Sequence, residues 1–195
     1  MIESLYDPFK KWSEGGSVWI ISDPHFGDAD CPYMNPGWVS PEEQVRRINR
    51  FVQRNETLII LGDVGNKEWI RRLNGYKVLL TGNHDSGKSV YQRDSLFNEV
   101  YNGPLTISDR IILSHEPVML PFMSNIHGHC HGGKMRYINE FGCGCINVAA
   151  DVCDYSPINL GREIKNGLLS TTPTIHRVTI DLAAMNRGAK LLRKG

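Results

Sequence analysis

The sequence predicts an α/β fold of two stacked sheets with helices outside. Strand-like and helix-like segments alternate through the N-terminal half, which favours a parallel sheet. The C-terminal half contains more short strand-like runs, which favour a more antiparallel second sheet. A chain of 195 residues with 41% hydrophobic residues can bury a full core. No linker, repeat or low-complexity segment interrupts it, so a single domain over residues 1–195 is expected.

The N-terminal half contains three strand-like runs with two helix-like segments between them. A helix over 40–54 has Ser40 at its N-cap and Pro41 at its first position, and a shorter helix over 66–75 ends at a glycine. The strand-like runs are SVWIIS at 17–22, TLIILGD at 57–63 and YKVLLTG at 76–82.

In the C-terminal half, LTISDRIILSHE at 105–116 predicts a β-hairpin that turns near Ser108 and Asp109. CINVAAD at 145–151 and TIHRVTI at 174–180 predict further short strands. They flank a helix-like segment, NLGREIKNGLL at 159–169.

The composition of the chain indicates which kinds of binding partner to expect. A net charge of +1 argues against a long nucleic acid, which needs many phosphate contacts. No apolar run approaches the roughly 20 residues that span a bilayer, and the first residues lack the apolar stretch of a signal peptide. We therefore expect no membrane association and a cytoplasmic location. Five cysteines, an odd number, are interpreted as free thiols rather than as disulfides or a structural zinc site.

Polar residues able to bind metal follow the strand-like runs. In open α/β sheets, ligands bind beyond the carboxyl ends of the strands. Any one Asp or His there could be a turn former or a surface residue, but six of the seven histidines fall in these segments. The residues are Asp23, His25, Asp63, Asn83, His84, Asp85, His115, His127, His129 and His131.

This mixture of side chains favours a transition metal. Carboxylate and imidazole together suit manganese, iron, zinc or nickel, whereas oxygen ligands alone suit calcium or magnesium. A bridging aspartate can hold two ions roughly 3.5 to 4 Å apart, the spacing used in phosphoryl displacement. The residues therefore predict a hydrolase with two divalent transition-metal ions, manganese being the first choice.

Five short blocks, DPH, GDVG, GNHD, SHEP and GHCH, occur in this order between Asp23 and His131. They resemble the blocks of the calcineurin-like metallophosphoesterases, and their short spacing is similar to that of small bacterial or phage-type members without a cap. The resemblance implies a four-layer αββα sandwich of two mixed sheets, with two metals at one edge.

The resemblance also implies roles for individual residues. His84 would stabilise the transition state or protonate the leaving oxygen, and Asp85 could orient its ring. Asp63 would bridge the metals, and a metal-bound hydroxide would attack the phosphate ester. The implied ligands are Asp23, His25 and His131 for the first metal and Asn83, His115 and His129 for the second.

The expected substrate is a small phosphate ester, with a nucleotide among the candidates. A phosphodiesterase is favoured over a phosphomonoesterase or a nucleotide pyrophosphohydrolase, because little chain is left over for a specificity cap. The loop over 26–39, with Tyr33, Met34 and Trp38, is either a wall facing the substrate or an ordinary surface loop. Oligomeric state is left open.

Two alternatives come from other classes. Gly82–Ser89 matches the G-x-x-x-x-G-K-[ST] pattern of a P-loop NTPase, although the strand that would serve as Walker B precedes it. A non-catalytic scaffold with this fold is the other. The sequence does not assign a role to four further residues, namely His127, Cys130, Lys88 and Asp151.

Overall fold

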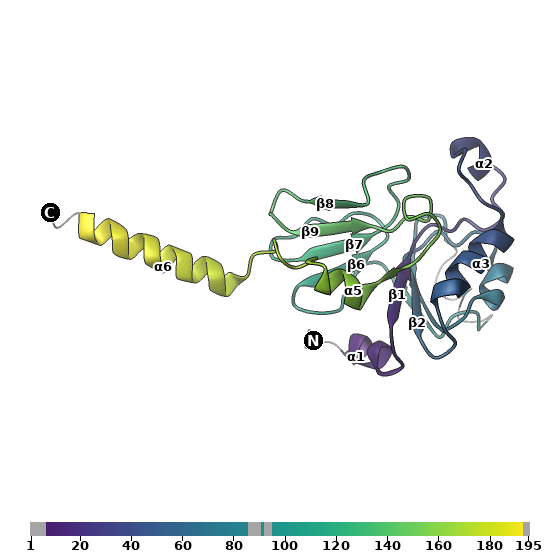
Figure 1. Cartoon of the computed structure of the whole chain (residues 1–195), viewed down its shortest axis with the longest axis horizontal. Coiled ribbons are helices and arrows are strands. Elements are labelled where there is room, and N and C mark those ends of the chain that lie inside the picture. The colour runs from purple at the N-terminus through teal and green to yellow at the C-terminus, as the bar shows by residue number, and fades with distance from the viewer. Residues whose placement is uncertain (1–6, 86–90, 92–94, 193–195) are drawn as a thin grey trace.

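A computed structural model describes residues 7–85, 91 and 95–192. Within them the chain forms two five-stranded mixed sheets with helices around them, an α/β arrangement (Figure 1). The two sheets lie beside each other in the body of the molecule. One long helix extends away from that body toward the C-terminus.

In the first sheet, β1 to β4 run parallel and β10 pairs antiparallel with β1. The parallel core predicted from the alternating pattern is confirmed. Every residue of β1 and β2 is buried, which explains why both strands are continuous apolar runs. In sheet order the strands are β10 (Ile158–Asn159), β1 (Val18–Ile21), β2 (Thr57–Ile60), β3 (Tyr76–Thr81) and β4 (Glu99–Asn102).

The second sheet is mixed, but its centre is parallel. The predicted hairpin is confirmed, because β5 pairs antiparallel with β6, whereas β6, β7 and β9 run parallel. The second sheet is nevertheless more antiparallel than the first, as expected, because β8 also pairs antiparallel with β9. Its parallel strands are joined by segments without helices, so the pattern that usually marks a parallel sheet is missing. In sheet order the strands are β5 (Leu105–Thr106), β6 (Ile111–Ser114), β7 (Ser124–His127), β9 (Gly144–Asn147) and β8 (Arg136–Ile138).

Most of the helices are short. The predicted N-cap of α3 is confirmed, since the Ser40 hydroxyl accepts a hydrogen bond from the backbone of Glu43 at 3.3 Å. The second predicted helix is a 3-10 helix, η1, rather than an α-helix. The elements are α1 (Asp7–Glu14), α2 (Cys31–Met34), α3 (Pro41–Phe51), η1 (Lys67–Arg72), α5 (Leu160–Lys165) and α6 (Ile175–Leu192).

The segment 174–180 was predicted to be a strand, but the structure places it at the start of α6. The β-branched residues of this short window suggested a strand, whereas the longer segment adds Ala, Met and Leu, which favour a helix. Ile175 and Met185 on α6 are 68% and 71% exposed. No helix in the described part of the chain is long and apolar enough to cross a membrane.

Apolar residues form two clusters, one on each face of the first sheet. Along β2, Leu58 and Ile60 belong to the cluster that contains residues of α3 and η1, whereas Ile59 belongs to the cluster shared with the second sheet. Because successive side chains of a strand point to opposite faces, one face of the first sheet packs on the second sheet and the other packs against α3 and η1. At the carboxyl ends of β1 and β9, Ser22 forms a parallel bridge with Ala149. The strand ends of both sheets therefore meet at one edge.

Candidate metal centre

The predicted ligands converge at the edge where the two sheets meet. Each lies just beyond the carboxyl end of a strand, so the topology brings together residues that are far apart in sequence. Among the described residues, three groups could each hold a metal ion, with one ligand atom per residue and all such atoms within 4.8 Å of one another. Two of them contain only predicted ligands and are called the first and the second group: Asp23, His25 and His131, and Asp63, His115 and His129. The third combines His25 with Asp28 and Cys31.

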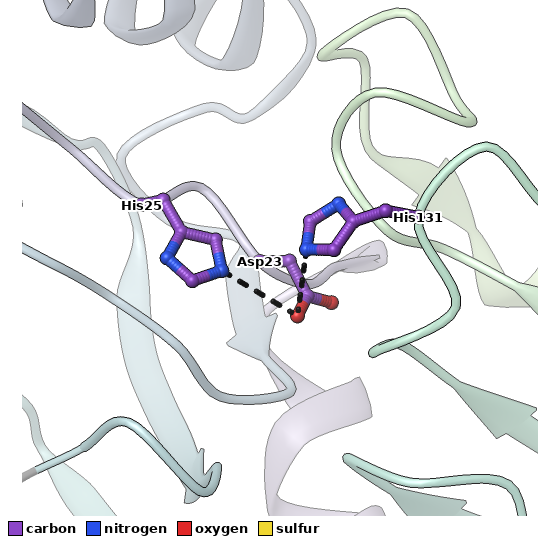
Figure 2. Close-up of side chains that lie close together, drawn as sticks. All are labelled: Asp23, His25 and His131. Carbon is purple, nitrogen blue, oxygen red and sulfur yellow. Dashed lines mark ion pairs between the residues drawn. The ribbon is translucent and has the colours of Figure 1, made fainter. Parts of the chain in front are cut away.

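Asp23 is at the centre of the first group. Its Oδ2 accepts a hydrogen bond of 2.8 Å from the backbone of His129. Its Oδ1 is buried and has no hydrogen-bond partner within the described ranges. Figure 2 shows that His25 and His131 approach this oxygen, with Nε2 atoms at 4.0 and 3.8 Å. Burial raises the pKa of Asp23. An unpaired buried carboxylate oxygen between two imidazole nitrogens is an arrangement that a cation would complete.

Asp63 lies between the two groups. Its Oδ2 is 3.6 Å from His25 Nε2 in the first group and 3.4 Å from His115 Nε2 in the second. In the second group, His115 Nε2 is also 3.2 Å from His129 Nδ1 and 2.7 Å from the Asn83 side-chain oxygen. One carboxylate oxygen thus faces both groups, as a bridging ligand must.

Hydrogen bonds fix the orientation of two of the histidine rings. His115 Nδ1 is 2.8 Å from the backbone oxygen of Leu61, which can only accept, so Nδ1 carries a proton and Nε2 is the nitrogen that faces Asn83 and the site. His131 Nδ1 is 2.9 Å from Asp151 Oδ1, which turns its Nε2 toward Asp23. Both rings are thereby held with Nε2 turned toward the site.

Asp151, whose role the sequence left open, is the partner of His131. Its Oδ2 also accepts a hydrogen bond of 2.8 Å from the backbone of Gly132. The hydrogen bond to Asp151 raises the pKa of His131. Asp151 lies shortly after β9, so the strand-end rule that identified the other residues applies to it as well.

Asp151→Asn is expected to lower metal affinity by about 10- to 100-fold, because a carboxylate that accepts from a ligating histidine fixes its ring and raises its basicity. Titration of the metal-free protein with Mn²⁺ against a competing chelator measures the change. Asp109→Asn, which removes a carboxylate from the exposed hairpin turn, should leave the affinity unchanged. Equal affinities for the two variants would contradict the positioning role of Asp151.

Four of the site residues have left-handed backbone conformations, with φ of 54° at Asp23, 41° at His25, 53° at Asp63 and 65° at His129. Such conformations cost energy in non-glycine residues and persist where the surrounding structure enforces them. Gly128 leaves room for the arrangement, since an added Cβ would collide with the Asp23 carboxylate. Half of the eight non-glycine residues with positive φ in the described part of the chain thus lie at this edge of the sheets.

Asp85 has a different role from the one predicted. Its Oδ2 accepts hydrogen bonds from the backbones of Asp63 and Gly82, and its Oδ1 accepts from the backbone of Val64 and the hydroxyl of Tyr91, all at 2.9 Å. The carboxylate is thus occupied by donors other than the His84 ring. Asp85 ties the loop after β2 to the loop after β3.

His84 lies outside all three of these groups. Its backbone N–H donates to Asp63 Oδ1 at 2.9 Å, which holds the residue beside the centre. Its exposed ring is 5.7 Å from the ring of His25. The ring faces the pocket next to the metal groups, so it could reach a bound substrate.

His127 is buried and has a structural setting. Its Nδ1 is 2.8 Å from the backbone oxygen of Gly128, and its Nε2 is 2.8 Å from the hydroxyl of Tyr137. Burial lowers the pKa of His127, so it is held in its neutral form. Cys130 belongs to neither metal group. Lys88 and the rest of the P-loop pattern after Asp85 lie outside the described residues.

A pocket of about 560 Å³ opens beside the centre. The loop over 26–39 forms one wall of it, although Tyr33 points outward and is 90% exposed. The segment after β7 and Asp151 line the pocket as well. The lining residues from this loop are Asp28, Asp30, Cys31, Asn35 and Trp38.

The chain matches no family model and no curated protein sequence. It resembles a crystal structure of a protein of unknown function from Aquifex aeolicus, with 27% identity, a TM-score of 0.61, and coverage of 77% of this chain and 98% of that one. A crystal structure of the nuclease MPE from Pseudomonas putida matches with 26% identity, a TM-score of 0.44, and coverage of 58% of this chain and 61% of that one. The first likeness indicates that the two-sheet fold is shared across most of this chain.

Proposed function

We propose that the protein is a metal-dependent phosphoesterase of the calcineurin-like type, with a phosphodiester as its favoured substrate. The observation that carries the proposal is the buried, unpartnered Oδ1 of Asp23, approached by His25 and His131. A second group lies beside it, and Asp63 Oδ2 faces both. The proposal includes the four-layer αββα arrangement and the single domain of that family.

The donor set fits two divalent transition-metal ions, because it combines carboxylate and amide oxygens with imidazole nitrogens. Asp23, His25 and His131 would hold one ion, and Asn83, His115 and His129 the other, with Asp63 shared. Such ions supply Lewis-acid stabilisation of a phosphate and a nucleophile at neutral pH. Manganese is our first choice, and iron, zinc and nickel fit the same donors.

Proton transfer and the positioning of the metal ligands are assigned to further side chains. His84 faces the pocket and is placed to donate a proton or a hydrogen bond to the leaving oxygen. Asp151 holds His131 in the tautomer that leaves Nε2 free. Asp85 fixes the backbone that carries Asp63. Binding, orientation and proton transfer are thus assigned to separate residues.

Charge supports a diester over a monoester. The described pocket lining includes Asp28 and Asp30, and it includes neither lysine nor arginine. A phosphate monoester carries a second negative charge near neutral pH, whereas a diester carries one. The wall therefore opposes the monoester more strongly.

The proposal is tested by metal analysis of the purified protein, followed by hydrolysis of bis(p-nitrophenyl) phosphate and p-nitrophenyl phosphate with and without added Mn²⁺. We expect bound transition metal, metal-dependent hydrolysis and a higher kcat/KM for the diester. Absence of bound metal together with no cleavage of either ester under any metal would refute the proposed function. A higher kcat/KM for the monoester would refute only the diester preference.

A further inference from the structure

The outer wall of the pocket carries negative charge. Asp28 and Asp30 lie on the loop over 26–39, and Asp28 Oδ1 accepts a hydrogen bond of 3.0 Å from the backbone of Asp30. The other oxygen of Asp28 is 3.6 Å from His25 Nδ1, and the Asp28 side chain is 41% exposed. Asp28 thus belongs to the third group that could hold a metal ion, with His25 and Cys31, and also reaches the solvent side of the pocket.

A buried thiol, Cys31, lies in the same wall. Burial, together with the carboxylates of Asp28, Asp30 and Asp151, raises the pKa of Cys31 to about 12. Cys31 is therefore an uncharged thiol at neutral pH, and three carboxylates act on one point of the wall. Their combined potential favours a positive group in the outer pocket.

An aromatic side chain lies in the same wall. Trp38 is partly buried and packs edge-to-face against Tyr155, with ring centroids 5.5 Å apart and an angle of 90°. Its backbone N–H donates to the oxygen of Asn35 at 2.9 Å. The indole is thus held in place, and it lines the same pocket as Asp28 and Asp30. Tryptophan is the aromatic side chain that attracts cations most strongly, quaternary ammonium groups included.

The inner end of the pocket would attract a negative group once metals are bound, whereas the outer wall attracts a positive one. The buried, unpartnered Oδ1 of Asp23 indicates that this end is built for cations, and a phosphate would bind to those cations. A ligand that fits both ends is anionic at its phosphate and cationic a few bonds away. A dinucleotide polyphosphate or a nucleic-acid end would instead place further phosphates against Asp28 and Asp30.

We propose that the substrate is a zwitterionic phosphodiester, in which one esterified alcohol carries an ammonium group of the choline or ethanolamine type, held between Trp38 and the carboxylates of Asp28 and Asp30. This inference rests on the proposed function. In the reaction, water forms the new P–O bond, the bond to the other alcohol breaks, and that alcohol leaves with a proton.

The test compares two chromogenic diesters that differ in one atom. In p-nitrophenyl phosphorylcholine the alcohol carries a quaternary nitrogen, and in p-nitrophenyl 3,3-dimethylbutyl phosphate a carbon replaces it. With the full chain and Mn²⁺, we expect kcat/KM to be about fivefold higher or more for the choline ester, chiefly through KM. Fivefold corresponds to the ~1 kcal/mol of a cation–aromatic contact.

The outcomes separate this inference from the proposed function. Equal kcat/KM for the two esters, with bis(p-nitrophenyl) phosphate cleaved, would overturn the zwitterion inference alone. Failure to cleave any of the three would overturn the proposed function. Calorimetric titration with choline phosphate and 3,3-dimethylbutyl phosphate gives a readout without turnover, and equal Kd values there would also overturn the inference.

Variants test the wall itself. Replacing both Asp28 and Asp30 by Asn should bring the ratio of the two kcat/KM values close to one, and Trp38→Leu should lower it. The double variant Asp109→Asn, Glu140→Gln removes two exposed carboxylates outside the pocket lining and should leave the ratio unchanged. If both double variants change the ratio equally, net charge rather than the wall is responsible, and the inference fails.

Hydrolysis of glycerophosphocholine in solution and of phosphatidylcholine in vesicles distinguishes a soluble ester from a lipid, since both present the same headgroup. The preference for the choline ester should also weaken as salt is raised, because Asp28 is partly exposed and its attraction is screened. A preference that does not change between low and high salt would contradict a role for the carboxylates.

Discussion

Asp63→Asn is expected to weaken metal binding at both groups together and to reduce phosphodiester hydrolysis by at least about 100-fold, beyond the usual effect of losing a residue that only supports a ligand. The reason is geometric. Asp63 Oδ2 faces His25 in one group and His115 in the other, so one oxygen serves both. Asparagine keeps the size of the side chain but removes the negative charge that balances two cations.

The measurement is the number of metal ions bound per chain after dialysis against a fixed free Mn²⁺ concentration, with kcat/KM determined on the same samples. Asp109→Asn serves as the matched control, because it removes one carboxylate from an exposed turn. Circular dichroism of the metal-free variants checks that the fold is intact. A folded Asp63→Asn variant that still binds two ions with unchanged affinity would contradict the shared role.

His84→Ala is expected to leave metal binding unchanged and to lower kcat by about 10²- to 10⁴-fold, the usual contribution of a general acid. The ring of His84 faces the pocket but belongs to neither ligand group. If it protonates the leaving oxygen, the loss should be larger for an alkyl ester than for a p-nitrophenyl ester, because p-nitrophenolate leaves without a proton. Comparing kcat for the two esters tests this step directly.

His176→Ala provides the matched control, since His176 is exposed on α6 and lies outside the pocket lining. It should change neither metal content nor kcat. Loss of metal from His84→Ala to the same extent as from Asp63→Asn would contradict the separation of roles. An equal loss of kcat for the alkyl and p-nitrophenyl esters would instead favour stabilisation of the phosphate over proton donation.

The convergence of Asp23, Asp63 and Asn83 could be predicted from the sequence, because buried parallel strands end at a common edge. The directions in which side chains point beyond the strand ends could not be predicted from the sequence. Asp63 and His129 adopt left-handed backbone conformations that no periodic pattern describes. The role of Asp85 was missed for the same reason, since its partners are backbone N–H groups presented by neighbouring loops.

In the fold, too, features that depend on local sequence could be predicted, whereas features that depend on contacts between distant segments could not. The strands β1, β2 and β3 were predictable as continuous apolar runs. The parallel pairing of β6, β7 and β9 was not, because pairing depends on contacts between distant segments joined by irregular chain. The strand predicted at 174–180 was wrong because a short window of β-branched residues cannot be told from the first turns of a long helix.

The hydrogen bond from the backbone of His129 to Asp23 joins the ends of a strand in each sheet. A metal held by Asp23 and His131 would close the same long loop of chain, as a disulfide cross-link does, and would stabilise the state in which the two sheets are packed together. Bound metal would then raise the free energy of unfolding of the packed sheets. Removal of the metal by a chelator would break that cross-link reversibly.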